Sequence, residues 1–315
     1  MSGQKPIVVV GSINTDLVAV TRRIPAIGET VIGTDFQIHP GGKGANQAVA
    51  VARLGYPVRL IGRLGSDPFA AQLRTHLQSA GVDIAGVATS DGTSGVAVIV
   101  VSSLGENSIV VTPGANSKVT PQDLEANIEI IRDAGIVLAQ LEIPLETVEC
   151  LASICARENV SLILDPAPAR DLAASMFKHI EWFTPNQTEA AFYAASERGK
   201  GPISDPAELA GILLSRGCQG LVLKMGEQGV YVASQRGPGG EVPAFPVKAI
   251  DTTAAGDAFN GGFATALMLG KTPMESARFA SAVAAISVTR HGAQPSMPAM
   301  AEVEAFMDKE AARTP

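Results

Sequence analysis

Short, continuous runs of β-branched and other apolar residues alternate along this chain with longer amphipathic segments. The strand-like runs occupy residues 7–12, 58–61, 136–141, 161–164 and 221–225. The helix-like segments occupy residues 47–54, 69–78, 145–157 and 207–216. This alternation predicts an α/β fold with a mostly parallel central sheet and helices on both of its faces. Ligands of such sheets bind at the carboxyl ends of the strands, and most of the candidate residues follow strands.

Two pairs of strand-like segments interrupt this alternation. Residues 17–20 are followed by 30–37, and residues 95–101 by 108–111, with no helical pattern inside either pair. The turn sequence Ser-Leu-Gly-Glu-Asn at residues 103–107 supports a hairpin in the second pair. The four segments form either a small sheet of their own or edge strands of the main sheet.

The composition argues against several classes of protein. A chain of 315 residues, 46% hydrophobic and 17% charged, is long enough for one large or two small α/β domains, and its net charge of −7 does not suit a nucleic-acid-binding surface. The three cysteines form no CxxC pair and the four histidines lack zinc-ligand spacing. We therefore expect reduced thiols and a cytoplasmic protein. No apolar run approaches the roughly 18 residues of a membrane span, and the N-terminus lacks a signal-peptide pattern.

Residues 251–263 read D-T-T-A-A-G-D-A-F-N-G-G-F and lead into an apolar helix expected at residues 258–269. The small residues from Ala254 to Gly256 let a ligand approach the backbone, and free N–H groups at a helix start bind anions. Asp257, in the same turn, can take the proton of a hydroxyl that attacks a phosphoryl group while the amides stabilise the charge. Alternatively, Asp257 only caps the helix and the glycines ease its packing.

The pattern D-T-x-A-A-G-D-x-F-x-G-G resembles the C-terminal signature of the ribokinase (PfkB) family of carbohydrate kinases. Residues 41–48, G-G-K-G-A-N-Q-A, resemble the family's N-terminal signature, and the similarity extends from about Val8 to Phe306. The resemblance implies a ribokinase-like fold with an α/β domain at residues 1–16, 38–94 and 113–315. Residues 17–37 and 95–112 would then form a small β-lid over the sugar, which is also the contact of a homodimer.

The resemblance also implies a sugar site. Its residues would be Asn14, Asp16, Gly42, Lys43, Asn46, Glu142 and Asp257. Carboxylates and amides suit vicinal hydroxyls, because each can pair with two at once. Taken alone, residues 41–46 are neither a Walker A loop nor a dinucleotide fingerprint, and they are equally consistent with a simple helix entry.

For the nucleotide and the metals, the resemblance implies three further groups of residues. Asn186 would contact the phosphates, and Glu189 would organise Mg²⁺ and its waters. The other nucleotide-binding residues would be Lys224, Gly226, Gly229, Gly256 and Ser281. The family often has threonine in place of Lys224, so the role of this lysine stays open. A K⁺ site would be built from Asp251, Thr253, Ser287, Arg290, Gly292 and Ser296.

The activity that the resemblance implies is ATP-dependent phosphorylation of D-ribose at O5, giving D-ribose 5-phosphate and ADP. Asp257 would act as general base, with the anion hole formed by Ala254, Ala255, Gly256 and Asp257. Partners would be the sugar, ATP, Mg²⁺ and K⁺, with neither nucleic acid nor membrane. Another kinase of the family, acting on deoxyribose, fructose, a ketodeoxy sugar acid or a nucleoside, is the alternative. A catalytically dead sensor would have lost Asp257 or Gly256, and both are present.

Overall fold

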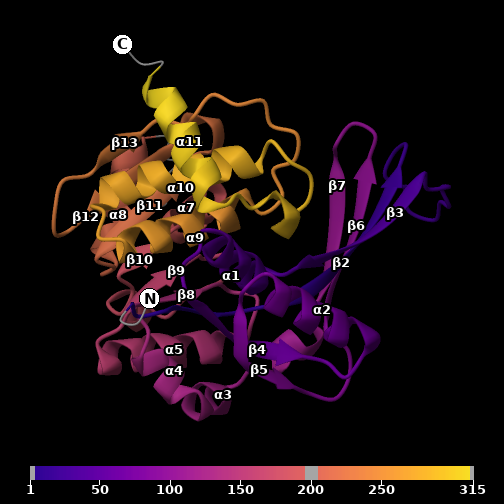
Figure 1. Cartoon of the computed structure of the whole chain (residues 1–315), viewed down its shortest axis with the longest axis horizontal. Helices are drawn as coiled ribbons and strands as arrows, with labels where there is room; N and C mark the ends of the chain where they lie inside the picture. Colours follow the sequence, from indigo (N-terminus) through magenta and orange to yellow (C-terminus); the bar gives the residue numbers. More distant parts are fainter. Residues whose placement is uncertain (1–3, 196–204, 313–315) are drawn as a thin grey trace.

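The computed structural model describes residues 4–195 and 205–312, which form two sheets and the helices around them (Figure 1). Residues 1–3, 196–204 and 313–315, which the expected α/β domain includes, lie outside the described residues. The larger sheet has nine strands in the order β13-β12-β11-β10-β9-β8-β1-β4-β5. In chain order these are Ile7–Val10 (β1), Val58–Leu64 (β4), Asp83–Thr89 (β5), Ile136–Ala139 (β8), Ser161–Leu164 (β9), Trp182–Phe183 (β10), Gly220–Lys224 (β11), Val230–Ser234 (β12) and Gly240–Val242 (β13).

The strands from β11 to β5 pair in parallel, and only β12 and β13 are antiparallel additions at one edge. The prediction of a mostly parallel sheet is therefore confirmed. β1 lies in the interior of the sheet between β4 and β8. Its Ile7 and Val9 pack into one hydrophobic core and its Val8 and Val10 into another, all four fully buried. A strand buried on both faces reads as an unbroken apolar run, which is why the sequence reveals it.

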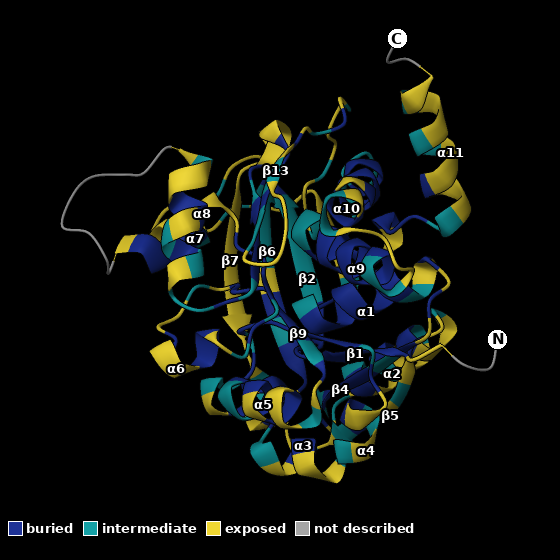
Figure 2. Cartoon of the chain, turned by 90° about the vertical axis from the view of Figure 1, so that its left-hand side faces the viewer, coloured by how far each residue is buried: buried dark blue, intermediate teal, exposed yellow. Residues whose placement is uncertain are grey.

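Helices cover both faces of this sheet, as expected. One face packs against Lys43–Arg53 (α1), Pro68–Ser79 (α2), Ala255–Met268 (α9), Pro273–Ser287 (α10) and Met300–Ala311 (α11). The other face packs against Pro121–Ala126 (α3), Ile128–Arg132 (α4), Leu145–Glu158 (α5), Ala174–Phe177 (α6), Gln187–Ala195 (α7) and Pro206–Ser215 (α8). Figure 2 shows α1 and α9 among the most buried helices. No helix in the described part of the chain is long and apolar enough to cross a membrane.

The second sheet has four strands in the order β3-β2-β6-β7 and projects from the main body (Figure 1). Its strands are Asn14–Thr21 (β2), Asp35–Gly41 (β3), Gly95–Ser102 (β6) and Asn107–Thr112 (β7). It is separate from the nine-stranded sheet, so the alternative of edge strands is wrong. The expected boundaries also shift. The ladder of β2 with β6 starts at Asn14, and β3 pairs with β2 as far as Gly41, so residues 14–16 and 38–41 belong to this sheet, whereas residues 30–34 are not strand.

Two helices begin earlier than their apolar periodicity suggests. α1 starts at Lys43 rather than at residue 47, and α9 starts at Ala255 rather than at 258. Each follows a residue with positive φ, Gly42 at 88° and Ala254 at 58°, which turns the chain into the helix. The first turns consist of small or polar residues, which is why apolar periodicity does not reveal them.

Candidate active site

The carboxyl ends of the parallel strands meet the first turns of α1 and α9 at one edge of the sheet. Polar side chains follow each strand there: Ser12 follows β1, Gln140 follows β8, Asp165 follows β9, and Lys224 ends β11. All of them are buried or partly buried. The sheet topology thus brings together residues from distant parts of the sequence, at the edge where α/β proteins bind ligands.

Asp257 lies at the centre of this arrangement, in the first turn of α9. Its side chain accepts hydrogen bonds from two residues of α1: Asn46 Nδ2 donates to Oδ2 at 2.9 Å, and Gln47 Nε2 donates to Oδ1 at 3.0 Å. Burial raises the pKa of Asp257 to about 6, with Lys43 acting in the opposite direction and Asp165 adding to the rise. In the described part of the chain the carboxylate accepts from these α1 side chains and from no backbone N–H of α9, which argues against the alternative that Asp257 merely caps α9.

The start of α9 presents unpaired backbone N–H groups. The Ala255 amide already donates to the Thr252 carbonyl at 3.2 Å. The amides of Gly256 and Asp257 have no acceptor within residues 4–195 and 205–312. The Ala254 amide likewise has no acceptor in this part of the chain, so of the four amides expected to form the anion hole only that of Ala255 is already paired.

The expected sugar residues gather around Asp257. Asp16, from β2, has a pKa raised to about 6 by burial and by the nearby charges of Glu142 and Asp257. Glu142 accepts from the Ser12 hydroxyl at 2.5 Å and from the Lys43 backbone N–H at 3.3 Å. Burial alone would lower the pKa of the Lys43 ammonium, but Asp257, Asp165 and Glu142 raise it above its usual value. The lysine therefore stays protonated among carboxylates.

Two amide side chains of this region are fixed by neighbours that the sequence interpretation missed. Asn116 donates from Nδ2 to Asn14 Oδ1 at 2.7 Å, and its own Oδ1 accepts from the Ile13 N–H at 2.9 Å. Gln294 donates from Nε2 to Asn46 Oδ1 at 3.0 Å. Because the Asn46 oxygen is occupied, its amide nitrogen must face Asp257. The orientation of both amides is therefore set by the protein itself.

Most of the expected nucleotide residues lie at or after the ends of β10 and β11, whereas Gly256 lies in α9 and Ser281 in α10. Asn186 and Glu189 cap α7 reciprocally, each side chain accepting from the other's backbone N–H at 2.8 Å. Gly226 and Gly229, with φ of 60° and 94°, form the turn between β11 and β12. Ser281 lies in α10, buried, with a hydroxyl that has no hydrogen-bond partner in the described part of the chain.

The expected cation loop does lie beside Asp251. The carboxylate accepts from the Thr253 N–H at 2.9 Å and from the Gly292 N–H at 2.8 Å. Burial alone would raise the pKa of Asp251, but the hydrogen bonds from Thr253 and Gly292 lower it. The hydroxyls of Ser287 and Ser296 donate to carbonyls within their own turns, at 2.8 and 2.7 Å.

The Arg290 side chain is the one member of this set whose chemistry does not suit a cation. It pairs with Glu302 at 2.5 Å, and a guanidinium offers no lone pair to a metal ion. Only the Arg290 carbonyl is suited to the role of ligand. Arg290 can therefore be a K⁺ ligand only through its backbone carbonyl, not through its side chain.

Asp165 and Gln47 are the most prominent members of the site that the sequence interpretation did not assign. Asp165 accepts from Gln47 Nε2 at 3.0 Å and from Lys224 Nζ at 2.9 Å. Its sequence signal is a carboxylate directly after the apolar run at 161–164 and directly before a proline. Gln47 stands inside the N-terminal signature, but nothing local distinguishes it from a helix-surface glutamine.

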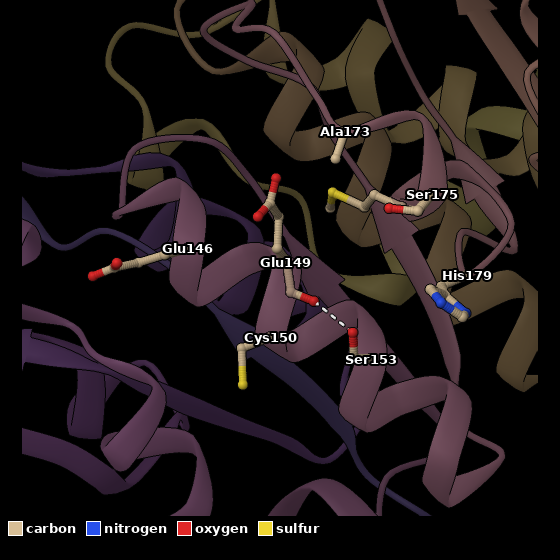
Figure 3. A pocket seen from close by; sticks show the side chains of 8 residues that line it. Glu146, Glu149, Cys150, Ser153, Ala173, Ser175 and His179 are labelled. Atoms are coloured by element: carbon tan, nitrogen blue, oxygen red, sulfur yellow. Dashed lines mark hydrogen bonds between the residues drawn. The ribbon is translucent and has the colours of Figure 1, made fainter.

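A surface cavity of about 340 Å³ lies elsewhere, between α5 and residues 173–179 (Figure 3). The Glu149 carboxylate points toward Ala173, whereas Cys150 points the other way. None of the candidate residues above lines this cavity. It is therefore separate from the site at the edge of the sheet.

Comparison with known proteins identifies the family. The model of the pfkB family of carbohydrate kinases matches residues 4–300. The chain belongs to this family. It is 40% identical over 306 residues to the ribokinase of Haemophilus influenzae, covering 97% of this chain and 99% of the relative. It is 34% identical over 306 residues to the deoxyribokinase of Salmonella typhi, covering 96% and 98%.

Among solved structures, that of Arabidopsis thaliana ribokinase complexed with ribose and ATP superposes with a TM-score of 0.89 at 32% identity. The match covers 97% of this chain and 99% of the other. The expected ribokinase-like fold, with a large mostly parallel sheet and a small second sheet, is therefore confirmed. As a pfkB family member the chain is a carbohydrate kinase.

Proposed function

We propose that this chain transfers the γ-phosphoryl group of ATP to O5 of D-ribose, giving D-ribose 5-phosphate and ADP. Full-length similarity to ribokinases supports this reaction, and so does similarity to a structure that holds ribose and ATP. The single observation that carries the mechanism is the placement of Asp257. Its buried carboxylate lies in the first turn of α9, where backbone amides are unpaired, and it is surrounded by the polar side chains of α1.

In the proposed step, the O5 hydroxyl attacks the γ-phosphorus while its proton passes to the Asp257 carboxylate. A new O5–P bond forms as the bond from the γ-phosphorus to the β,γ-bridging oxygen breaks, and ADP carries the electron pair away. The Gly256 and Asp257 amides stabilise the negative charge of the transferring group. Closure of the four-stranded lid over the sugar would exclude water, which competes as acceptor.

Sugar recognition falls to residues on β2, on α1 and after β8. We assign Asp16, Lys43, Asn46 and Glu142 to the hydroxyls, with Asn14 beside them and Gly42 giving the backbone access. For the nucleotide we assign Lys224, Gly226, Gly229, Gly256 and Ser281. The unpaired Ser281 hydroxyl is the observation that supports a ligand at α10.

Mg²⁺ and K⁺ fit the oxygen-rich groups of this chain. We assign Asn186 to the nucleotide phosphates. Glu189, whose pKa is raised by burial and by nearby Asp165, offers carboxylate oxygens to Mg²⁺ and its waters. Mg²⁺ would neutralise charge on the phosphates. For K⁺ we assign the ionised Asp251 with Thr253, Ser287, Gly292, Ser296 and the Arg290 carbonyl. The three free thiols fit a reducing compartment such as the cytoplasm.

An ADP-release assay over pentoses, hexoses and nucleosides tests the proposal. We expect ribose to be preferred over 2-deoxyribose, because the missing hydroxyl leaves a buried polar group unpaired. Such a loss costs about 1–3 kcal/mol, or roughly 5- to 150-fold in kcat/KM. Equal kcat/KM for the two sugars, or turnover only with a hexose or nucleoside, would contradict the ribose assignment. Running the same assay with and without K⁺ tests the proposed K⁺ site. A rate of ADP release that does not depend on K⁺ would contradict this site but not the proposed kinase activity.

The homodimer is the second testable part of the proposal. Strand register places Leu17, Ile38, Val98 and Val110 in one row across all four strands of the lid. Ile38, Val98 and Val110 are 50%, 45% and 64% exposed, and this face is opposite to the one carrying Asp16. An exposed apolar row of this kind marks a protein interface. We propose that it is covered by the same row of a second chain.

Val110→Asp should therefore convert the dimer to a monomer in light scattering. A charge buried in an apolar interface costs at least about 2 kcal/mol, so the dimer Kd should rise roughly 30-fold or more. Phe192→Asp, at an exposed apolar residue of α7, is the matched control and should leave the mass unchanged. A wild-type protein that is monomeric at micromolar concentration refutes the lid dimer.

A further inference from the structure

One buried carboxylate contacts both halves of the reaction centre. Asp165 follows β9 directly and is only 2% exposed. Its Oδ1 accepts from Lys224 Nζ at 2.9 Å, and its Oδ2 accepts from Gln47 Nε2 at 3.0 Å. The two donors come from different elements, Lys224 from β11 and Gln47 from α1. Each carboxylate oxygen thus has one partner of its own.

Gln47 connects Asp165 to the proposed base. Its Nε2 donates to Asp257 Oδ1 at 3.0 Å as well as to Asp165. Its Oε1 accepts from Gln140 Nε2 at 2.7 Å. That bond fixes which end of the Gln47 amide faces the two carboxylates, because a flipped amide would set two nitrogens against each other.

Lys224 connects Asp165 to the anion site at the start of α9. A methyl group added at Gly256 would lie 3.4 Å from Lys224 Nζ, so the ammonium lies close to Gly256, in the turn that carries the unpaired amides. The lysine side chain is 14% exposed and the Asp165 side chain 3%. An ammonium has three N–H donors. Asp165 occupies one of them, which leaves two for an anion at this position.

We propose that Asp165 is a positioning residue that holds Lys224 against the transferring phosphoryl group and Gln47 against Asp257. This inference rests on the proposed phosphoryl transfer and assigns Lys224 to the γ-phosphate. A free lysine side chain samples many rotamers, and fixing it beforehand removes that entropy from the transition state. The same carboxylate keeps the base and the cation at a fixed separation.

Asp165→Asn is the informative substitution, because an asparagine has one acceptor oxygen for two donors. Either Lys224 or Gln47 must then face an amide nitrogen. We expect kcat to fall about tenfold, less than the roughly 10²–10³-fold of losing a transition-state donor completely. In calorimetry without sugar, binding of Mg·AMP-PNP should weaken about tenfold while ADP binding changes less than twofold, since only the former has a γ-phosphate.

Lys224→Met removes the other partner of the Lys224–Asp165 pair. It also provides a test of the proposal if the Asp165→Asn variant does not fold. This substitution should weaken the binding of Mg·AMP-PNP but leave the binding of ADP unchanged. It also leaves Asp165 as an uncompensated buried charge. Adding Asp165→Asn to Lys224→Met should therefore not lower kcat further, so the two effects are non-additive. Glu181→Gln is the matched control, because it breaks the exposed pair with Arg236 and should change neither kcat nor binding.

Folded Asp165→Asn enzyme with kcat and Mg·AMP-PNP affinity within twofold of wild type would overturn the proposal. So would a Lys224→Met variant that binds Mg·AMP-PNP and ADP as wild type does. A purely structural Asp165 would lower the melting temperature alone. If wild type phosphorylates no sugar of the panel but the γ-phosphate-specific binding losses occur, the proposed reaction fails while the placement of Lys224 by Asp165 stands.

Discussion

Asp257→Asn should lower kcat by about 10²–10⁴-fold, the usual contribution of a general base. Ribose and ATP should still bind, because the shape of the site is kept, and a residual rate should remain from positioning and from the Gly256 and Asp257 amides. Asparagine cannot accept from both Asn46 and Gln47, but the substitution also removes a buried charge. These effects on the free energy of unfolding oppose each other, so we expect stability to change little.

Asp205→Asn is the matched control for helix capping. Asp205 caps α8 by accepting from the Ala207 N–H at 3.0 Å, away from the site. Asparagine caps about as well as aspartate, so this variant should keep wild-type stability and kcat. Steady-state kinetics, calorimetric binding and thermal melts on both variants distinguish a general base, whose loss lowers kcat alone, from a structural residue, whose loss lowers stability. An Asp257→Asn enzyme that is folded and turns over at a near-normal rate would refute the base role.

The sequence was most informative where local pattern and tertiary environment agree. β1, β8 and β9 are buried on both faces and read as short apolar runs. Other elements gave no such pattern. β5 is half exposed and contains a glycine, and α10 is buried almost all round, so its periodicity is weak. The lid boundaries were misplaced because the ladder of β2 follows almost directly on β1, with no turn sequence strong enough to mark the change of sheet.

For the site, the two signature stretches supplied the residues that lie close together in sequence. The interactions that orient them join residues far apart. Gln294 contacts Asn46 across 248 positions, and Asn116 contacts Asn14 across 102. Asp165 reaches Gln47 across 118 positions. A single sequence carries no signal for such pairs, because each partner alone is an ordinary polar residue of a helix, a strand or a loop.

The rate constant kcat should fall as pH is lowered through about 6. The Asp257 carboxylate must be ionised to accept a proton, and burial raises its pKa to about 6. Below that value the ionised fraction drops about tenfold per pH unit, so the rate at pH 4 should be roughly 100-fold below its plateau. Asp16 has a pKa of the same size, so kcat/KM reports both groups together and kcat measured at saturating ribose isolates the base more cleanly.

The same raised pKa makes an opposite prediction for stability. Asp257 binds its proton more tightly in the folded protein than an ordinary aspartate, whose pKa is 3.8, so this group stabilises the folded state as pH falls from about 6 to 4. The charged carboxylate destabilises it above pH 6. The unfolding free energy of Asp257→Asn relative to wild type should therefore be higher at pH 8 than at pH 5, as measured by urea denaturation. A kcat that is flat from pH 5 to 8, together with a pH-independent difference in stability, would show that Asp257 titrates normally and is not the buried base.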